Sequence, residues 1–265
     1  MSRTLHDTVV ADLADRLQLA ERTRQPLDPI SATHPSMTPA DAYAVQQVIT
    51  ARRVDAGSRI IGWKLGLTSV AMQRQLGVDQ PDYGPILSDW VVPDGGEVRV
   101  ADLIQPRVEA EIAFILGADL SGPGVTAADV RAATEAVTPS LEIIDSRIRD
   151  WRIGLTDTVA DLASTARVIV GSTRTALDEG LEPRELRVVL ERDGKVIDEG
   201  IGAAALGDPI EAAAWAANTL GALGVWLEAG HVIMTGALHA SVPIRSGESY
   251  RATIDRLGST SIRIG

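Results

Sequence analysis

The chain has 265 residues, enough for one large domain or two small ones with a sizeable core. Hydrophobic residues make up 45% and charged residues 23%, an ordinary balance for a globular protein in water. The formal net charge of -11 argues against binding to nucleic acid or an anionic membrane, because both are polyanions. The lack of cysteine excludes disulfides and thiolate chemistry. Without an apolar leader or an apolar run long enough to cross a membrane, we expect a cytoplasmic protein.

The segment 1–58 is predicted to be mainly helical. Apolar residues recur over 9–20 at nearly the 3.6-residue period of a helix. A loop rich in proline, serine and threonine follows over 25–37. Thr38 then has the pattern of an N-cap, with proline at the first position of a helix that continues to about Arg53.

From residue 59 onward, the pattern favours strands. The predicted strands span 59–65, 97–100, 107–116, 138–145, 165–170, 186–192, 195–202, 231–235, 249–255 and 259–264. Asp193 and Gly194 mark a hairpin between two of them. The predicted helices in this part span 70–76, 126–136 and 209–223. Many strands with few inserted helices predict an α+β fold with a mixed or antiparallel sheet. We expect one domain over 1–265, with a β-rich body over 59–265.

Three glutamates interrupt apolar runs of this body. Glu109 and Glu111 lie two residues apart within the predicted strand 107–116, and Glu142 interrupts the predicted strand 138–145. Side chains alternate along a strand, so the first two carboxylates should lie on one face, about 7 Å apart.

The three glutamates have two interpretations. A buried carboxylate is costly unless it is paired or binds a cation, and a hard divalent metal ion with oxygen ligands would relieve the repulsion among three. The alternative is that each acid forms a structural ion pair with an arginine such as Arg107 or Arg147.

Lys64 stands within the hydrophobic segment 60–69, between Trp63 and Leu65. One interpretation is that its long side chain carries the ammonium group to the surface. If the side chain is held inside instead, burial should lower its pKa and make it a usable proton donor and acceptor. Downstream, the turn-rich segment 76–84 is predicted to be a loop that carries Asp82 beside an aromatic residue.

Several segments, in chain order, carry a resemblance to a known family. They are Gly62-Trp-Lys-Leu-Gly-Leu-Thr68, Gly77-Val-Asp-Gln-Pro-Asp-Tyr-Gly84, Pro106-Arg-Val-Glu-Ala-Glu-Ile112, Leu141-Glu-Ile-Ile-Asp-Ser-Arg147, Asp157-Thr-Val-Ala-Asp161 and Ile233-Met-Thr-Gly-Ala237. Together they resemble the 2-keto-4-pentenoate hydratase and 4-oxalocrotonate decarboxylase family of the fumarylacetoacetate hydrolase superfamily. The similarity runs from about Ala40 to the end of the chain.

The resemblance implies a mixed β-roll or sandwich of the fumarylacetoacetase C-terminal type with peripheral helices. It also implies a homo-oligomer with Mg²⁺ or Mn²⁺ in each subunit. By position it assigns Glu109, Glu111 and Glu142 as the metal ligands. The catalytic residues expected are Lys64, Asp82 and Ser164. The residues expected to bind substrate are Leu65, Arg107, Thr235, Gly236 and His239.

One position departs from the family pattern. The family usually has Ala-Asp-Asn-Ala-Ser where this chain has Ala160-Asp-Leu-Ala-Ser164. Leu162 therefore replaces an amide near Ser164. If position 162 faces the substrate, the change favours a less polar distal group; if it packs in the core, it leaves substrate preference unaltered.

The expected function is that of a metal-dependent lyase, and the resemblance implies a place in aromatic or steroid ring catabolism. The first expectation is a hydratase that adds water to a 2-hydroxy-2,4-dienoate and forms a 4-hydroxy-2-oxo acid. The alternative is a decarboxylase of the 4-oxalocrotonate type, which releases CO₂ from a 2-oxo-enedioate. A second alternative is an inactive subunit that partners an active paralogous enzyme.

Overall fold

The computed structural model describes residues 3–69, 73–74 and 77–265. The helices of the N-terminal segment are α1 (Asp7–Thr23), α2 (Ile30–Thr33) and α3 (Pro39–Asp55). The predicted cap of α3 is confirmed: the Thr38 hydroxyl accepts from the Asp41 amide, and the Asp41 carboxylate accepts in return from the Thr38 amide. This reciprocal capping satisfies donors that a helix N-terminus otherwise leaves unpaired.

A seven-stranded mixed sheet forms the centre of the molecule and carries the candidate site. Its strand order is β2-β1-β9-β4-β5-β6, and β10 pairs with β4. The strands are β1 (Ile60–Gly66), β2 (Asp82–Leu87), β4 (Arg107–Leu116), β5 (Thr134–Ile144), β6 (Thr165–Val170), β9 (Val232–Met234) and β10 (Val242–Pro243). Strands β1 and β9 run parallel, whereas β4 and β5 form the long antiparallel pair.

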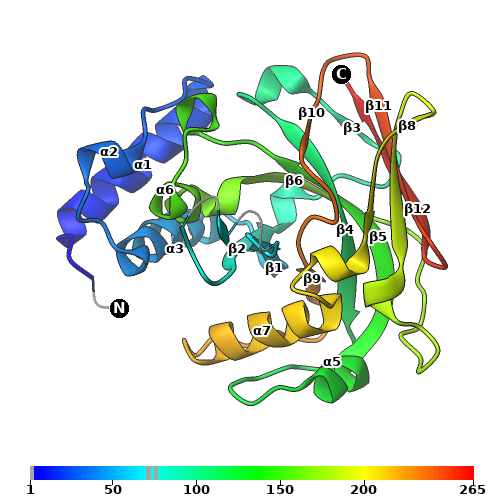
Figure 1. The fold of residues 1–265 in the computed structure, drawn as a ribbon. Helices are drawn as coiled ribbons and strands as arrows, with labels where there is room; N and C mark the ends of the chain where they lie inside the picture. The colour runs from blue at the N-terminus through cyan, green and yellow to red at the C-terminus, as the bar shows by residue number, and fades with distance from the viewer. Residues whose placement is uncertain (1–2, 70–72, 75–76) are drawn as a thin grey trace.

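A second, five-stranded sheet has the order β3-β12-β11-β7-β8. Its strands are β3 (Glu97–Val98), β7 (Arg187–Arg192), β8 (Lys195–Ile201), β11 (Ser249–Ile254) and β12 (Gly258–Ile264). The hairpin predicted at Asp193 and Gly194 is confirmed between β7 and β8. Figure 1 shows the two sheets facing each other, with β11 and β12 beside β5.

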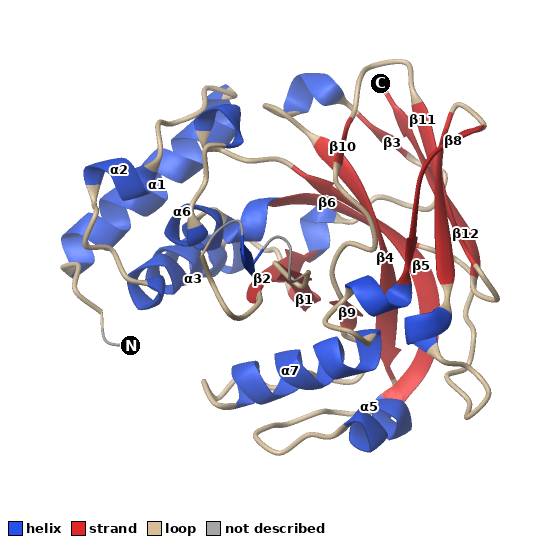
Figure 2. Cartoon of the chain, viewed as in Figure 1, coloured by secondary structure: helices blue, strands red, loops and turns tan. Residues whose placement is uncertain are grey.

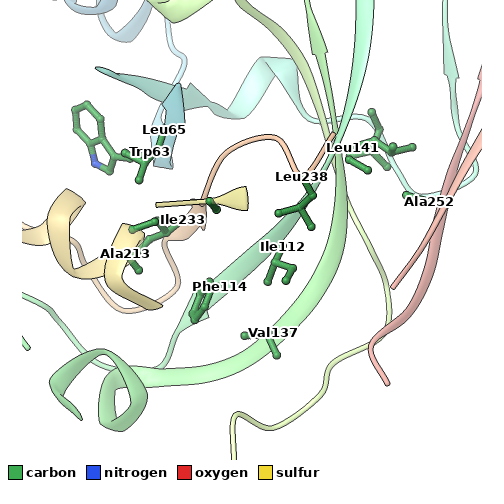
Figure 3. Close-up of a cluster of buried hydrophobic side chains, with 14 of the residues drawn as sticks. Trp63, Leu65, Ile112, Phe114, Val137, Leu141, Ala213, Ile233, Leu238 and Ala252 are labelled. Carbon is green, nitrogen blue, oxygen red and sulfur yellow. The ribbon is translucent and has the colours of Figure 1, made fainter. Parts of the chain in front are cut away.

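The main core lies between the two sheets and the helices that close their lower end. Alternate residues of β4, among them Ile112 and Phe114, are fully buried in it. Figure 3 shows these side chains with Leu238 and Val137 around them. The helices at this end are α5 (Ala127–Ala133) and α7 (Pro209–Gly221). Figure 2 shows them below the sheets, apart from the N-terminal helices.

A second apolar cluster joins the N-terminal helices to the sheet body. Leu13 of α1 and Ile49 of α3 pack there with Leu87 of β2, Leu162 and Val159. Val159 belongs to α6 (Leu155–Ala160), a short helix that contacts α3. The α+β fold with peripheral helices predicted from the sequence is confirmed.

Several predicted boundaries are wrong for identifiable reasons. The segment ending at residue 84 was expected to be a loop, but Asp82–Leu87 forms β2. Its Pro85 is tolerated because β2 is an edge strand of the sheet. The helix predicted over 126–136 ends at Ala133, because Thr134 already begins β5. The helix predicted over 70–76 falls largely outside the described residues. Among those described, no helix is both long enough and apolar enough to cross a membrane.

Candidate metal and active site

The three glutamates converge where β4 and β5 lie side by side. Glu109 of β4 stands directly across from Glu142 of β5, and Glu111 follows on the same face of β4. Each offers an oxygen within 4.8 Å of those of the others. Glu111 and Glu142 are fully buried. Like charges placed directly opposite each other repel, so this arrangement fits a group that binds a cation.

The hydrogen bonding of these carboxylates leaves oxygens without partners. Glu111 accepts one bond at Oε2 from the Gly236 amide (2.8 Å), but its Oε1 has no hydrogen-bond partner. Neither oxygen of Glu142 has one. Burial, followed by the charge of Glu142, raises the pKa of Glu109 to about 7 and that of Glu111 well above its usual value. Unpartnered buried oxygens at this spacing are the donor set that Mg²⁺ and Mn²⁺ take in proteins.

The arginines proposed as alternative partners form no described ion pair with the three glutamates. Among the described ion pairs, none joins Arg107 or Arg147 to the three glutamates, and Arg147 is buried against Asp161. The ion-pair interpretation of the glutamates is therefore wrong for both arginines.

Lys64 is held inside the protein rather than extended to the surface. It lies on β1 with 3% of its surface exposed, and its Nζ donates to the Ala163 carbonyl at 3.0 Å. The same atom lies 3.4 Å from Glu142 Oε2. Burial alone would lower the pKa of Lys64, but the carboxylates of Glu142 and Asp82 outweigh burial and raise it. The lowered pKa expected from the sequence is therefore wrong here, and Lys64 holds its proton.

Asp82 lies at the start of β2, opposite Gly66 of β1. A Cβ atom on Gly66 would lie 2.2 Å from Asp82 Oδ1, so only glycine leaves room for this carboxylate. Burial raises the pKa of Asp82, while Lys64 opposes that shift. The acid expected on a loop is thus fixed on a strand and buried beside the lysine.

Ser164 ends a turn of unusual backbone conformation. Leu162, Ala163 and Ser164 have φ angles of 58°, 51° and 58°, all in the left-handed region. Each such residue other than glycine costs about 1–2 kcal/mol. The turn directs the Ala163 carbonyl at Lys64, and the Ser164 hydroxyl lies 3.4 Å from that of Thr158.

Arg147 holds this turn at both ends. Its guanidinium donates to the carbonyl oxygens of Asp161 (2.6 Å) and Thr165 (3.1 Å), which flank the turn, and it ion-pairs with the Asp161 carboxylate. The Ser164 carbonyl also accepts from the Asp145 amide. Nothing in Leu-Ala-Ser signals a left-handed turn, because the conformation is imposed by these distant contacts.

A cavity of about 620 Å³ opens beside these residues. The predicted residues that line it are Lys64, Leu65, Asp82, Arg107, Glu109, Ser164 and His239. Sequence reasoning missed the apolar part of the wall, which includes Ile144, Trp151 and Ile153. Arg107 lies 5.1 Å from the centre of the Trp151 ring and donates to the Ser241 hydroxyl.

Two predicted substrate contacts lie outside this wall. Thr235 is fully buried and its hydroxyl donates to the Ile112 carbonyl at 2.9 Å. Gly236 directs its amide at Glu111 rather than into the cavity. A Cβ on Gly236 would lie 2.1 Å from Thr68 Oγ1, so this approach also requires glycine. Both residues therefore contact β4: Thr235 binds its backbone, and Gly236 binds the Glu111 carboxylate.

Fold and site together define a class of protein: a mixed-sheet scaffold with three converging carboxylates and a buried lysine beside a cavity. The fumarylacetoacetate (FAA) hydrolase C-terminal family matches residues 64–264, and the chain belongs to this family.

Named relatives agree with this membership over nearly the whole chain. The chain is 44% identical to a 2-keto-4-pentenoate hydratase of Burkholderia vietnamiensis (strain G4 / LMG 22486) over 253 residues, 96% of each chain. It is 41% identical to a 4-oxalocrotonate decarboxylase of Pseudomonas putida over 263 residues, 99% of each. A solved structure of 4-oxalocrotonate decarboxylase from Pseudomonas putida G7, complexed with magnesium and adipate, matches with a TM-score of 0.95 and 40% identity, covering 100% of both chains.

Proposed function

We propose that this protein is a metal-dependent hydratase. It adds water to a 2-hydroxy-2,4-dienoate and forms a 4-hydroxy-2-oxo acid, which makes it a hydro-lyase. The observation that carries the proposal is the group of three converging carboxylates with buried Lys64 at one end of the cavity. The hydratase at 44% identity over 96% of the chain supports the same reaction.

Glu109, Glu111 and Glu142 would hold the metal ion, Mg²⁺ or Mn²⁺. The oxygens of Glu111 and Glu142 that lack a hydrogen-bond partner fit such an ion, and the solved relative is described as complexed with magnesium. When bound, the ion would stabilise negative charge on the C2 oxygen of the substrate. The Gly236 amide holds Glu111 Oε2, which leaves Oε1 available as a ligand.

Lys64 is the proton donor and acceptor of the proposed reaction. A proton added at C5 and the loss of the enol proton give an unsaturated 2-oxo acid. Water then adds its oxygen to C4 and a proton to C3, so that the overall reaction adds one water molecule to the substrate. Because its pKa is raised, Lys64 is protonated and can donate a proton. Its hydrogen bond to the Ala163 carbonyl fixes the direction of Nζ. Asp82 and Ser164 line the same cavity as Lys64 and would orient the reacting carbons or the water.

The rest of the cavity wall fits an apolar distal group on the substrate. Leu65, Ile144, Trp151 and Ile153 supply apolar surface there. Arg107 takes part in no described ion pair, so its guanidinium can meet an anionic group of the substrate.

A decarboxylase of the 4-oxalocrotonate type is the second candidate. Arg107, lacking a carboxylate partner among the described ion pairs, would suit the second carboxylate of a 2-oxo-enedioate. The TM-score of 0.95 with a decarboxylase described as complexed with adipate, a diacid, supports the same alternative. We further propose a homo-oligomer in the cytoplasm that serves aromatic catabolism, alone or together with a paralogous enzyme.

One experiment separates these functions. The purified protein is incubated with Mg²⁺ and either 2-hydroxypenta-2,4-dienoate or 2-oxohex-3-enedioate, while dienol absorbance and CO₂ are recorded. A hydratase consumes the dienol without CO₂, and a decarboxylase releases CO₂ from the diacid alone. No turnover of either substrate would favour an inactive partner subunit and contradict both enzymatic proposals.

The metal assignment has its own test in Glu111→Gln. The amide keeps the shape of the side chain but removes its charge, so metal affinity and turnover should fall together, metal affinity by more than the roughly 10- to 100-fold that the loss of an outer-shell partner costs. Titration with Mn²⁺ and steady-state rates at limiting metal measure both quantities. Normal activity of this variant at limiting metal would contradict the assignment.

A further inference from the structure

The His239 side chain uses both of its ring nitrogens within the protein. Its Nε2 lies 3.1 Å from the Ala110 amide, which donates to it, and its Nδ1 lies 2.7 Å from the Ala240 carbonyl. A carbonyl oxygen accepts and an amide donates, so the ring is neutral with its proton on Nδ1. The side chain is 1% exposed. It therefore has no free nitrogen with which to act as a base or to hydrogen-bond the substrate.

The Ala110 amide faces a gap between two neighbouring strands. On that side of β4, β9 pairs with residues 113–115 and β10 pairs with residues 107–108. The segment 235–241 crosses the gap, and its Leu238 amide donates to the Ala110 carbonyl at 3.0 Å. The imidazole of His239 thus takes the place of a missing strand carbonyl as acceptor for the Ala110 amide.

Ala110 lies between Glu109 and Glu111, so its peptide determines how their carboxylates are directed. The charge of Glu142 directly opposite pushes Glu109 away, and half-buried Glu109 lies at the cavity wall. The same crossing segment holds Glu111 through the Gly236 amide. Two contacts from one segment therefore restrain both glutamates of β4.

We propose that His239 is a positioning residue for the divalent-cation site: by accepting the Ala110 hydrogen bond, it keeps Glu109 and Glu111 in the ligating arrangement. This inference rests on the proposed metal site and adds to it a residue that acts through the Ala110 peptide instead of binding the metal itself. Asp198, whose Oδ2 lies 3.8 Å from Nδ1, is too distant to replace the Ala240 carbonyl as its partner.

Two substitutions separate the two hydrogen bonds of the ring. In His239→Gln the amide oxygen reaches the position of Nε2 and accepts from Ala110. In His239→Asn the shorter amide reaches only the position of Nδ1 and donates to Ala240. Mn²⁺ affinity, measured by titration with paramagnetic resonance detection, should fall about 10- to 100-fold in His239→Asn. It should stay close to the wild-type value in His239→Gln. Both variants lose one hydrogen bond, so a general loss of stability would lower both melting temperatures alike.

Two results would overturn the positioning role: equal Mn²⁺ affinities in the two variants, or a weaker affinity in His239→Gln than in His239→Asn. Absence of a stoichiometric Mn²⁺ site in the wild-type protein would overturn the metal proposal as well, so the two failures are distinguishable. The ¹⁵N shifts of the wild-type imidazole supply a test that needs no variant. They should report a neutral ring protonated on Nδ1 with Mg²⁺ bound, and a proton on Nε2 in that state would contradict the inference.

Discussion

Lys64 shows how the charges of neighbouring side chains, rather than burial alone, determine the protonation state of a buried side chain. Its ammonium group lies among the carboxylates of Glu142, Asp82, Glu109 and Glu111, which raise its pKa. A cation bound to the glutamates would cancel part of this field and bring the pKa of Lys64 down. Metal binding and proton transfer are therefore coupled in the proposed reaction, because the same carboxylates serve both.

We predict that Lys64→Met separates proton transfer from metal binding. Methionine keeps the apolar stem but removes the ammonium group, so turnover should fall about 10²- to 10⁴-fold. Mn²⁺ affinity should be retained or increase, because the positive charge 3.4 Å from Glu142 is lost. Steady-state rates and Mn²⁺ titration measure the two effects. The chain has one other lysine, exposed Lys195, and Lys195→Met is the matched control. Near-normal turnover of Lys64→Met would mean that Lys64 transfers no proton and has a structural role only.

The role of Asp82 can be tested without changing its carboxyl group. In Gly66→Ala the new methyl carbon would lie 2.2 Å from Asp82 Oδ1, so the carboxylate must move. A shift of the carboxylate by about 1 Å should lower turnover about 10²-fold. Asp82→Asn, which removes the charge of the carboxylate, should lower turnover by a similar factor. In Gly180→Ala, by contrast, the new carbon would lie 3.5 Å from its nearest neighbour, which makes this substitution a control for added volume. Unchanged turnover in Gly66→Ala, with the fold intact by circular dichroism, would argue against a role for Asp82 in catalysis.

At the scale of helices and strands, the sequence predicted those features that depend on residues close together in the chain. The alternation along β4 placed Glu109 and Glu111 on one face because a buried strand leaves its side chains no other arrangement. Strand β2 was missed because Gly84 and Pro85 resemble a turn, and only its edge position makes them compatible with a strand. The left-handed turn at 162–164 was missed because Arg147 and Asp145, neither of them adjacent to the turn in sequence, hold it.

The role of Leu162 also could not be decided from neighbouring residues in the sequence. Of the two interpretations, contact with the substrate or packing in the core, the structure favours packing in the core. Its side chain is 3% exposed and packs in the apolar cluster with α1 and α3, and Leu162 is not among the residues that line the cavity. Leu162→Asn should therefore leave the preference between an alkyl dienoate and a diacid unchanged. The buried amide should cost about 1–3 kcal/mol of stability, although asparagine tolerates the left-handed backbone better than leucine.

Melting temperature and the ratio of kcat/KM values for the two substrates, measured on the same variant, test this expectation. Leu162→Met keeps an apolar side chain of similar volume and is the control for the loss of leucine itself. A shifted substrate ratio at unchanged stability would mean that position 162 acts on the substrate.

At the scale of the whole molecule, the N-terminal helices and the sheet body share one apolar cluster. Leu13 and Ile49 contribute from the helices, and Leu87 and Leu162 contribute from the body. The turn that carries Ser164 thus packs against the first helices of the chain. We propose that the whole chain folds as one unit and that loosening the N-terminal segment disturbs the candidate site.

Asp41 is the residue through which this proposal can be tested. Its buried carboxylate accepts from the amides of Thr4 and Leu5 as well as that of Thr38, and so ties the start of the chain to α3. Burial alone would raise the pKa of Asp41, but these hydrogen bonds outweigh burial and hold the pKa well below its usual value. The charged form therefore stabilises the folded state. This contribution is complete above the unfolded pKa of about 3.9 and is lost as pH falls toward the folded value.

We predict that Asp41→Asn lowers the free energy of unfolding by about 1–3 kcal/mol at pH 7, because charge-assisted bonds are lost and donors remain buried. The difference from wild type should shrink below about pH 4, where the wild-type carboxylate begins to take up its proton. Urea unfolding followed by far-ultraviolet circular dichroism and by tryptophan fluorescence measures this difference. In a single folding unit both signals change in one coincident transition, in the variant as in wild type. Two separated transitions, with only the helical signal shifted by Asp41→Asn, would mean that the N-terminal segment unfolds independently of the sheet body and of the site it carries.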